Sequence, residues 1–148
     1  MRIFLDANVL FSAAHRTEGS VRVFFRLAEA GVCELLASPY VLDEARRNIA
    51  RKHPEKASEL EQLIARIAIC QEATADEVRW ARSTGLPEKD APILAAAAHA
   101  KADFLVSGDR ADFGSLYERQ LRGLEVLPPR AALERILAAT GKQQPPPR

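Results

Sequence analysis

The chain has 148 residues, 47% of them hydrophobic and 28% charged, which excludes a disordered or fibrous polypeptide and fits one compact domain. Its formal net charge of +1 excludes the strong overall basicity that marks many nucleic-acid-binding proteins. No segment approaches the roughly 20 apolar residues of a membrane span, and Asp6 and Asn8 interrupt the first apolar run before it could form a signal peptide. We therefore expect a cytoplasmic protein that does not contact a membrane.

Apolar runs alternate with helical periodicity from the start of the chain. Residues 2–5 form an apolar run that predicts a first strand. Ser20 then opens a stretch with apolar residues at helical spacing, which closes at Gly31. Residues 32–37 predict a second strand. Ser38-Pro39 follows as a helix start, with Ser as N-cap and Pro in the first helical position, and this second helix is expected to run to about Lys52.

The middle of the chain continues the alternation. Pro54 opens another helical stretch, and residues 67–70 are a candidate third strand. Residues 74–77, Thr-Ala-Asp-Glu, have the form of a capping box ahead of a further helix. A long alanine-rich helix is expected from Asp90 to about Lys101, and residues 104–106 predict a fourth strand.

The last elements complete an α/β pattern. Residues 124–127 predict a fifth strand, and Pro128 or Pro129 begins a last helix that ends before Gly141. We expect one domain over residues 1–140 and a disordered C-terminal tail over residues 141–148. Alternating strands and helices indicate a three-layer α/β/α sandwich with a central parallel sheet of about five strands. In such sheets ligands bind beyond the carboxyl ends of the strands.

Two acidic residues follow predicted strands directly. Asp6 comes after the first strand and Asp109 lies just past the fourth, so both belong to the carboxyl edge of the sheet. Each could instead do no more than initiate a turn, particularly Asp109 beside Gly108. Together they make this edge the place to look for function.

Helical phase places two further acids toward the same edge. Glu44 borders the apolar stripe of its helix, whereas Asp43 points away from it. Asp90 shares its helical face with the apolar residues three, four and seven positions later. The structural alternatives are an exposed helical glutamate for Glu44 and a simple N-cap for Asp90.

Carboxylates gathered in one crevice repel one another, and their pKa values rise unless a cation is present. Hard oxygen ligands without cysteine or a well-placed histidine select Mg²⁺ or Mn²⁺ over zinc. The chemistry that such a site suits is metal-assisted hydrolysis of a phosphodiester.

Four motifs resemble those of the PIN-domain ribonucleases, many bacterial and archaeal members of which are VapC-type toxins. In chain order they are Asp6-Ala7-Asn8-Val9-Leu10, Ser38-Pro39-Tyr40-Val41-Leu42-Asp43-Glu44, Glu88-Lys89-Asp90-Ala91-Pro92-Ile93-Leu94-Ala95-Ala96-Ala97 and Ala102-Asp103-Phe104-Leu105-Val106-Ser107-Gly108-Asp109. The resemblance spans residues 1 to about 137. It implies a PIN fold and an endoribonuclease that depends on Mg²⁺ or Mn²⁺, cleaving single-stranded or loop RNA by in-line attack of a metal-bound water. It allows two protein partners, a cognate antitoxin and a second copy of the chain.

Carried over position by position, the resemblance makes four acids the catalytic, metal-binding set: Asp6, Glu44, Asp90 and Asp109. Asn8 and Ser107 match polar positions that support the site, with Ser107 standing where threonine is common, and Asp112 matches a position that is often acidic or amide. Four cations flank the motifs and could contact RNA phosphates: Arg46, Arg47, Lys89 and Arg110. Ordinary solvated charge is the alternative for each of these cations.

Other interpretations fit parts of the pattern. A receiver-type phosphoacceptor needs an aspartate after strand three and a lysine after strand five, where this chain has Gln71-Glu72 and Pro128-Pro129. A haloacid-dehalogenase phosphatase needs a second aspartate where this chain has Asn8. A non-toxin PIN protein that acts in RNA processing, and a module that binds RNA or protein without cleavage, stay open. Metal-dependent cleavage distinguishes the nuclease from the binding module.

Overall fold

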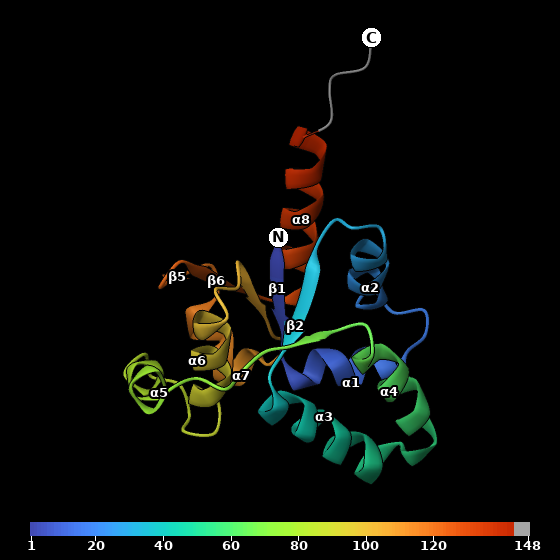
Figure 1. Ribbon diagram of the computed structural model, residues 1–148, viewed down its shortest axis with the longest axis horizontal. Coiled ribbons are helices and arrows are strands. Elements are labelled where there is room, and N and C mark those ends of the chain that lie inside the picture. Colours follow the sequence, from blue (N-terminus) through green and yellow to red (C-terminus); the bar gives the residue numbers. More distant parts are fainter. Residues whose placement is uncertain (144–148) are drawn as a thin grey trace.

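A six-stranded sheet lies at the centre of the molecule (Figure 1). In the computed structural model, which describes residues 1–143, the strand order is β3-β2-β1-β4-β6-β5. Neighbouring strands pair in parallel except β5 and β6, which pair antiparallel. The strands are β1 (Arg2–Leu5), β2 (Glu34–Ala37), β3 (Ala68–Ile69), β4 (Phe104–Val106), β5 (Gln120–Leu121) and β6 (Leu124–Leu127).

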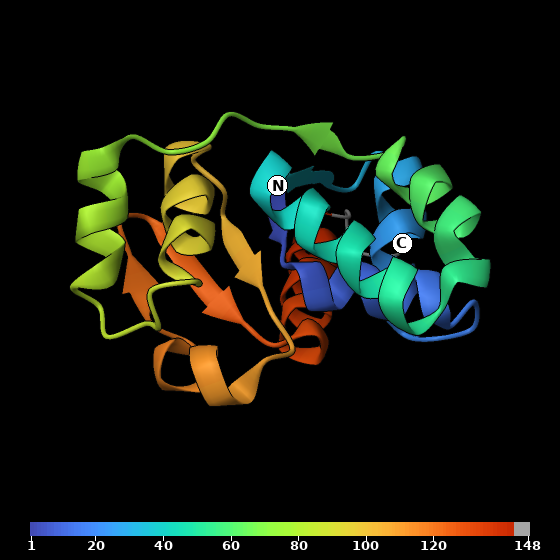
Figure 2. The ribbon, with the colours of Figure 1, turned by 90° about the horizontal axis from the view of Figure 1, so that it is seen from below.

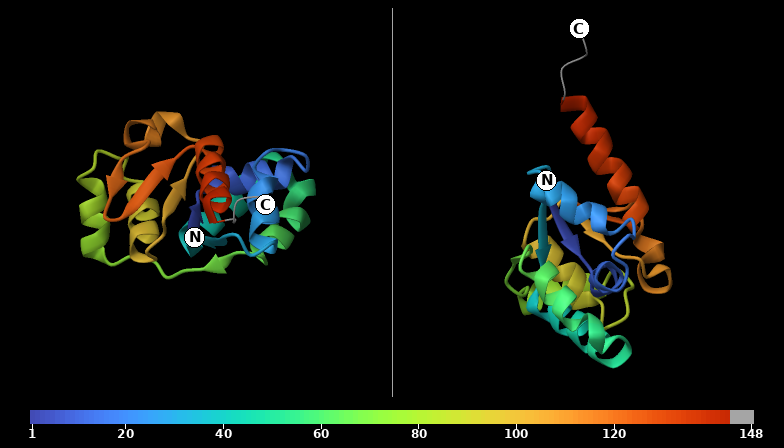
Figure 3. Two further views of the ribbon diagram at one scale, coloured as in Figure 1. Left: turned by 90° about the horizontal axis from the view of Figure 1, so that it is seen from above. Right: turned by 90° about the vertical axis from the view of Figure 1, so that its right-hand side faces the viewer.

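Helices surround this sheet and complete the α/β sandwich that the sequence predicted (Figure 3). They are α1 (Ala7–His15), α2 (Arg22–Glu29), α3 (Pro39–Lys52), α4 (Ala57–Ile64), α5 (Ala75–Arg82), α6 (Ala91–His99), α7 (Arg110–Phe113) and α8 (Pro129–Gln143), with 3-10 turns at Pro54–Lys56 and Gly114–Leu116. Helix α5 packs against α6 on one side of the molecule, and α1 packs against α3 and α4 on the other (Figure 1). Among the described residues, no helix is both long and apolar enough to cross a lipid bilayer.

All five predicted strands are present, and a sixth accompanies them. Strand β5 joins β6 through a two-residue hairpin at Arg122 and Gly123, whose φ angles are 50° and 84°. Two consecutive residues with positive φ match the twist of the flanking strands. The sequence analysis did not predict β5 because it has only two residues and its turn lacks the usual Asn-Gly or Asp-Gly pair.

Helix α1 was not predicted either. Asp6 caps it with extended backbone angles and accepts a hydrogen bond from the amide of Ala7. The helix is buried on several sides, with Val9, Leu10 and Ala13 all inaccessible to solvent or nearly so. Its polar residues Asn8, Ser12 and His15 share one face at helical spacing, but this amphipathic period extends over a helix of only nine residues.

Two predicted helix ends differ from the structure. Helix α6 ends at His99 rather than near Lys101, because Lys101 adopts a φ of 56° that ends a right-handed helix. Helix α8 continues through Gly141 to Gln143, so the prediction that it ends before Gly141 is wrong. A helical glycine weakens a helix by only about 1 kcal/mol and need not end it. Of the predicted tail, residues 141–143 are helical and residues 144–148 lie outside the described residues.

The predicted capping box at the start of α5 is present. Thr74 Oγ1 accepts from the amide of Glu77 at 3.2 Å, and Glu77 Oε1 accepts from the amide of Thr74 at 2.9 Å. The Glu77 carboxylate also lies 2.8 Å from Nδ1 of His99 and so connects α5 to α6. One cap therefore serves both a helix start and a helix packing contact.

Replacing Thr74 by Ala is expected to lower the free energy of unfolding by about 1 kcal/mol, because the helix loses its side-chain acceptor. Thr74→Ser is the matched control, since it keeps the hydroxyl. Urea unfolding of the three proteins measures the difference. An equal loss in both variants would show that the threonine methyl group, and not the cap, provides the stability.

Candidate active site

The carboxyl ends of β1 and β4 meet at the lower edge of the sheet, which Figure 2 shows from below. Leu5 pairs with Val106, so the next residues along the two strands, Asp6 and Ser107, lie side by side. Ser107 Oγ donates a hydrogen bond to Asp6 Oδ2 at 2.8 Å across a sequence separation of 101 residues. The sequence-predicted site therefore begins where the two central strands end.

Asp6 is held by three hydrogen bonds and is only 3% exposed. Its Oδ1 accepts from the amide of Ala7 at 2.7 Å, and its Oδ2 accepts from Ser107 and from Asn8 Nδ2 at 2.9 Å. A carboxylate has about four acceptor positions, so roughly one remains, on Oδ1. The side chain is fixed in place and keeps capacity for one further partner.

Asn8 and Ser107, two of the three predicted supporting residues, join the ends of both strands. Asn8 Nδ2 donates to Ser107 Oγ at 3.2 Å, and Asn8 Oδ1 accepts from the amide of Gly108 at 2.8 Å. Ser107 Oγ also accepts from the amide of Asp109 at 3.2 Å. A β-carbon at Gly108 would stand 3.4 Å from Asn8 Oδ1, a tight contact that glycine avoids.

Asp109 lies just beyond this network and begins the short helix α7. Its Oδ1 accepts from the amide of Asp112 at 3.1 Å, so it acts as an N-cap as well as a site acid. Tyr117, which no sequence signal pointed to, donates its hydroxyl proton to the carbonyl oxygen of Ser107 at 2.7 Å. These contacts fix the backbone that presents Asp109.

Glu44 comes from α3 and is partly exposed, whereas its neighbour Asp43 has a side chain that is 64% exposed. The negative charge of Glu44 contributes to raising the pKa of Asp6 and of Tyr40, which places it near both groups. Helical phase therefore distinguished the two adjacent acids correctly.

Asp90 is buried to 5% exposure and does not cap α6 with its side chain. Instead its carboxyl group lies beside that of Asp112, and Nζ of Lys89 lies 3.3 and 3.4 Å from its two carboxylate oxygens. Lys89 Nζ also donates to Asp112 Oδ2 at 2.7 Å. Asp90, Asp112 and Lys89 thus form a second cluster beside the first.

Two acids of the site are harder to ionise than ordinary aspartates. Burial raises the pKa of Asp6 from 3.8 to about 6, opposed by the hydrogen bonds that it accepts and assisted by the charge of Glu44. Burial also raises the pKa of Asp90 to about 7, and the neighbouring carboxyl group of Asp112 adds to this effect while Lys89 opposes it. Asp6 therefore has no positive partner among the described residues, whereas Lys89 offsets only part of the effect of burial on Asp90.

A divalent cation of the magnesium type suits these donors. Within residues 1–143, no three acidic, histidine or cysteine side chains are close enough together to hold a metal ion. Mg²⁺ does not require such a cage, because it keeps several waters and commonly uses only one or two carboxylates. Zinc needs four protein ligands in a structural site and three in a catalytic one. The carboxylate oxygens of this edge therefore fit Mg²⁺ or Mn²⁺ better than zinc.

The four flanking cations have different surroundings. Lys89 belongs to the acidic cluster, and Arg46 pairs with Glu61 of α4 at 2.7 Å. Neither Arg47 nor Arg110 forms an ion pair with the residues that the structure describes. Arg47 and Arg110 are therefore available for a ligand, whereas Arg46 is occupied by its partner.

A cavity of about 410 Å³ opens beside Asp109, the one acid of the four that lines it. Asn8, Gly108 and Asp109 line it at the site, and Ser12 and Val21 continue it along α1 toward the start of α2. Part of an extended ligand could lie here without displacing a side chain. The cavity gives the acidic edge a concave approach from one side.

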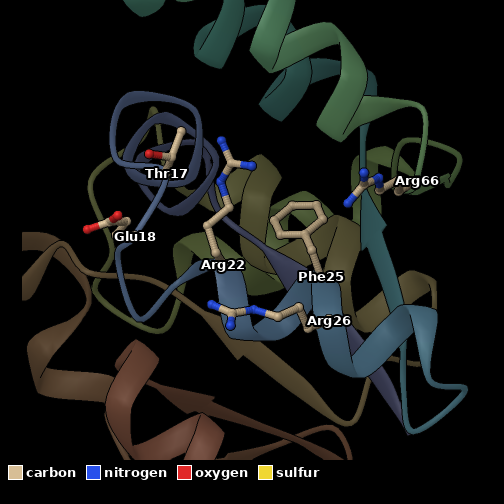
Figure 4. Close-up of a pocket in the computed structure, with 6 residues that line it drawn as sticks. All are labelled: Thr17, Glu18, Arg22, Phe25, Arg26 and Arg66. Atoms are coloured by element: carbon tan, nitrogen blue, oxygen red, sulfur yellow. The ribbon is translucent and has the colours of Figure 1, made fainter.

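A second cavity, of about 460 Å³, contains none of these acids (Figure 4). Three arginines line it, but Arg22 is fixed by Glu59 and by the carbonyl oxygen of Ala13, both at 2.6 Å, and Arg66 pairs with Glu29. Of these three arginines, only Arg26 has no ion-pair partner among residues 1–143. The acidic side chain of Glu18 also lines the cavity. Most of its positive charge is therefore already neutralised.

A sequence model of the PIN domain matches residues 2–111, which is about three quarters of the chain and includes all four acids, Asp6, Glu44, Asp90 and Asp109. This chain belongs to the PIN domain family. The match includes every residue of the hydrogen-bonded network around Asp6. No curated protein matches the sequence of this PIN domain.

Solved structures share the PIN fold. This chain is similar to a VapBC2 structure of Rickettsia felis bound to a DNA fragment of its promoter, with 19% identity, a TM-score of 0.65, and coverage of 86% of this chain and 98% of the other. It is similar to PAE2754 of Pyrobaculum aerophilum, with 18% identity, a TM-score of 0.66, and coverage of 93% and 96%. It is also similar to VapC20 of Mycobacterium tuberculosis, a toxin that cleaves the sarcin-ricin loop, with 16% identity, a TM-score of 0.52, and coverage of 74% and 92%. At these identities the likeness shows the fold.

Proposed function

We propose that this PIN domain is a metal-dependent endoribonuclease that cleaves single-stranded or loop RNA. The observation that carries the proposal is the pair of buried aspartates, Asp6 and Asp90, whose pKa values are raised to about 6 and about 7 at the carboxyl edge of the sheet. Buried carboxylates whose charge is not fully balanced are costly, and strongly raised pKa values are typical of functional sites. Membership of a nuclease family supports the same conclusion.

One or two of Asp6, Glu44, Asp90 and Asp109 would hold the cation as direct ligands and the others through bound water, since no three of these carboxylates converge within residues 1–143. When bound, Mg²⁺ or Mn²⁺ supplies activation of a water and neutralisation of charge on the phosphodiester. The chain itself orients the acids: Asn8 and Ser107 direct Asp6, and α7 directs Asp109. Because these partners lie on rigid elements, the acids need no rearrangement before RNA arrives.

The RNA backbone would pass the acidic edge with help from nearby cations. Arg47 and Arg110 are near enough to the site to influence the pKa values of Tyr40 and Tyr117, whose hydroxyls lie around the acids. Guanidinium groups bind phosphate in a planar, bidentate way. With a formal net charge of +1, the whole protein would bind RNA weakly and with a clear salt dependence.

The biological role that we propose is that of a toxin with a cognate antitoxin. Two observations support it: several similar structures are VapBC or FitAB complexes, and VapC20 is described as a toxin that cleaves an RNA loop. A homodimer is a further partner state consistent with the family. Slower growth of cells that express the chain alone, relieved by its antitoxin, would distinguish a toxin from an RNA-processing enzyme.

Purified protein is expected to cut members of a panel of single-stranded and structured RNAs in Mg²⁺ or Mn²⁺. It is expected to cut none in EDTA, because cleavage by this site requires the cation that the carboxylates hold. The Asp6→Asn, Asp90→Asn double variant is the matched control and is expected to be inactive under all conditions. Gel analysis of the products measures cleavage. Cutting by the double variant, or cutting in EDTA, would contradict the proposal.

A further inference from the structure

Lys89 occupies an unusual place for a surface lysine. Its Nζ lies 2.7 Å from Asp112 Oδ2 and 3.3 and 3.4 Å from the two oxygens of Asp90, so a single ammonium contacts two carboxylates. Asp90 is one of the acids proposed to hold the cation. The ammonium and a divalent cation would therefore depend on the same oxygens.

The backbone of Lys89 is anchored while its side chain is free to move. The hydroxyl of Tyr40 donates to the Lys89 carbonyl oxygen at 2.6 Å and fixes the segment to α3. The Lys89 side chain is nevertheless 63% exposed and has four rotatable bonds. It can leave the carboxylates for solvent without disturbing the fold.

We propose that Lys89 is an exchangeable occupant of the cation site, which gives way to a divalent cation and then contacts an RNA phosphate. This inference rests on the proposed function, because it assigns the cation to the same acids. While no divalent cation is bound, the ammonium neutralises part of the charge of Asp90 and Asp112. Once the divalent cation provides that charge, the ammonium is released beside the phosphate that the site receives.

If Lys89 exchanges with the cation, Lys89→Met should change Mn²⁺ affinity and RNA affinity in opposite directions. Removing the ammonium frees Asp90 and Asp112 from a competitor, so Lys89→Met should bind Mn²⁺ about three- to fivefold more tightly, the upper range expected for loss of one exposed ion pair. The same variant loses one phosphate contact, so it should bind RNA more weakly. A general loss of structure would weaken both kinds of binding.

We would measure Mn²⁺ affinity by isothermal titration calorimetry with Mn²⁺ alone. We would measure RNA affinity in Ca²⁺ at several salt concentrations, with a fluorescent mixed-sequence single-stranded RNA. For RNA, the log–log salt slope of Lys89→Met should be smaller in magnitude by about 0.7, the contribution of one phosphate of a single strand. Lys89→Arg keeps the charge and should stay near the wild type in both assays. Lys101→Met removes an exposed lysine at the opposite edge of the sheet and should change neither.

Unchanged or weaker Mn²⁺ binding by Lys89→Met would overturn the inference, as would an unchanged RNA affinity and salt slope. Absence of Mn²⁺ binding by all four proteins would overturn it as well. Cleavage is measured in neither assay. The exchange can therefore fail while the nuclease stands, and the nuclease can fail while the exchange of Lys89 stands.

Discussion

Asp6→Asn is expected to lower metal-dependent RNA cleavage by at least about a hundredfold and, at the same time, to make the protein more stable. Cleavage falls because the substitution removes a charged ligand of the proposed cation. Even the loss of a group that only hydrogen-bonds to a metal ligand lowers metal affinity or activity about 10- to 100-fold. Stability rises because a buried negative charge, repelled by Glu44, is removed. We expect a net gain of only about 1 to 2 kcal/mol at pH 7. The gain is limited because the new amide nitrogen cannot accept the hydrogen bond from Asn8, and this loss is destabilising.

The matched control is Asp43→Asn, which makes the same chemical change on an exposed face of α3 beside Glu44. It should leave both cleavage and stability close to those of the wild type. RNA cleavage in Mn²⁺ and urea unfolding in EDTA measure the two effects. A stable Asp6→Asn protein that cuts at the wild-type rate would refute the site, and an Asp6→Asn protein that is less stable would show that the carboxylate is a structural requirement.

The free energy of unfolding, measured in EDTA, is expected to fall by about 3 kcal/mol through Asp6 alone as the pH rises from 4 to 7. In the folded protein Asp6 has a pKa of about 6 instead of 3.8. Between these values the folded state holds more protons than the unfolded state, so stability decreases with rising pH. The difference of about 2 in pKa corresponds to about 3 kcal/mol, most of it lost by pH 6 to 7. Asp90 acts in the same direction up to about pH 7.

Other carboxylates act in the opposite direction at lower pH. The pKa values of Glu61 and Glu77 are lowered by hydrogen bonds, from Arg46 and from Thr74 respectively, and these exposed pairs favour folding once ionised. The contribution of Asp6 is therefore obtained from the difference between wild type and Asp6→Asn, measured by urea unfolding at each pH. This difference should grow from pH 4 to about pH 7 and then stay constant. A difference independent of pH would contradict the raised pKa of Asp6.

Local signals account for the parts of the fold that the sequence predicted. Ser38 caps α3 with Pro39 in its first turn, and Thr74 and Glu77 form the expected box, because each cap needs only residues three positions apart. Helix α1 escaped prediction because its amphipathic period spans only nine residues and none of its polar residues is fully exposed.

The site shows the same division. Strand ends and helical phase are local properties, and they predicted that Asp6, Asp109, Glu44 and Asp90 gather at one edge. In the structure Asp6 and Asp109 follow adjacent strands, whereas no three of the four carboxylates converge within residues 1–143. The sequence treated Lys89 only as a flanking cation. Its position between two carboxylates depends on how α7 meets the start of α6, which no short-range pattern encodes.

The hydrogen bond between Asp6 and Ser107 determines how late in translation the site can form. Its two residues are 101 positions apart, so a ribosome must complete more than two thirds of the chain before Asp6 can find its partner. Contacts this distant in sequence form late in folding. Nascent and prematurely terminated chains that lack β4 therefore contain the first acid but no assembled site. For a protein proposed to cut RNA in its own cell, RNA cleavage is therefore delayed until β4 has been synthesised.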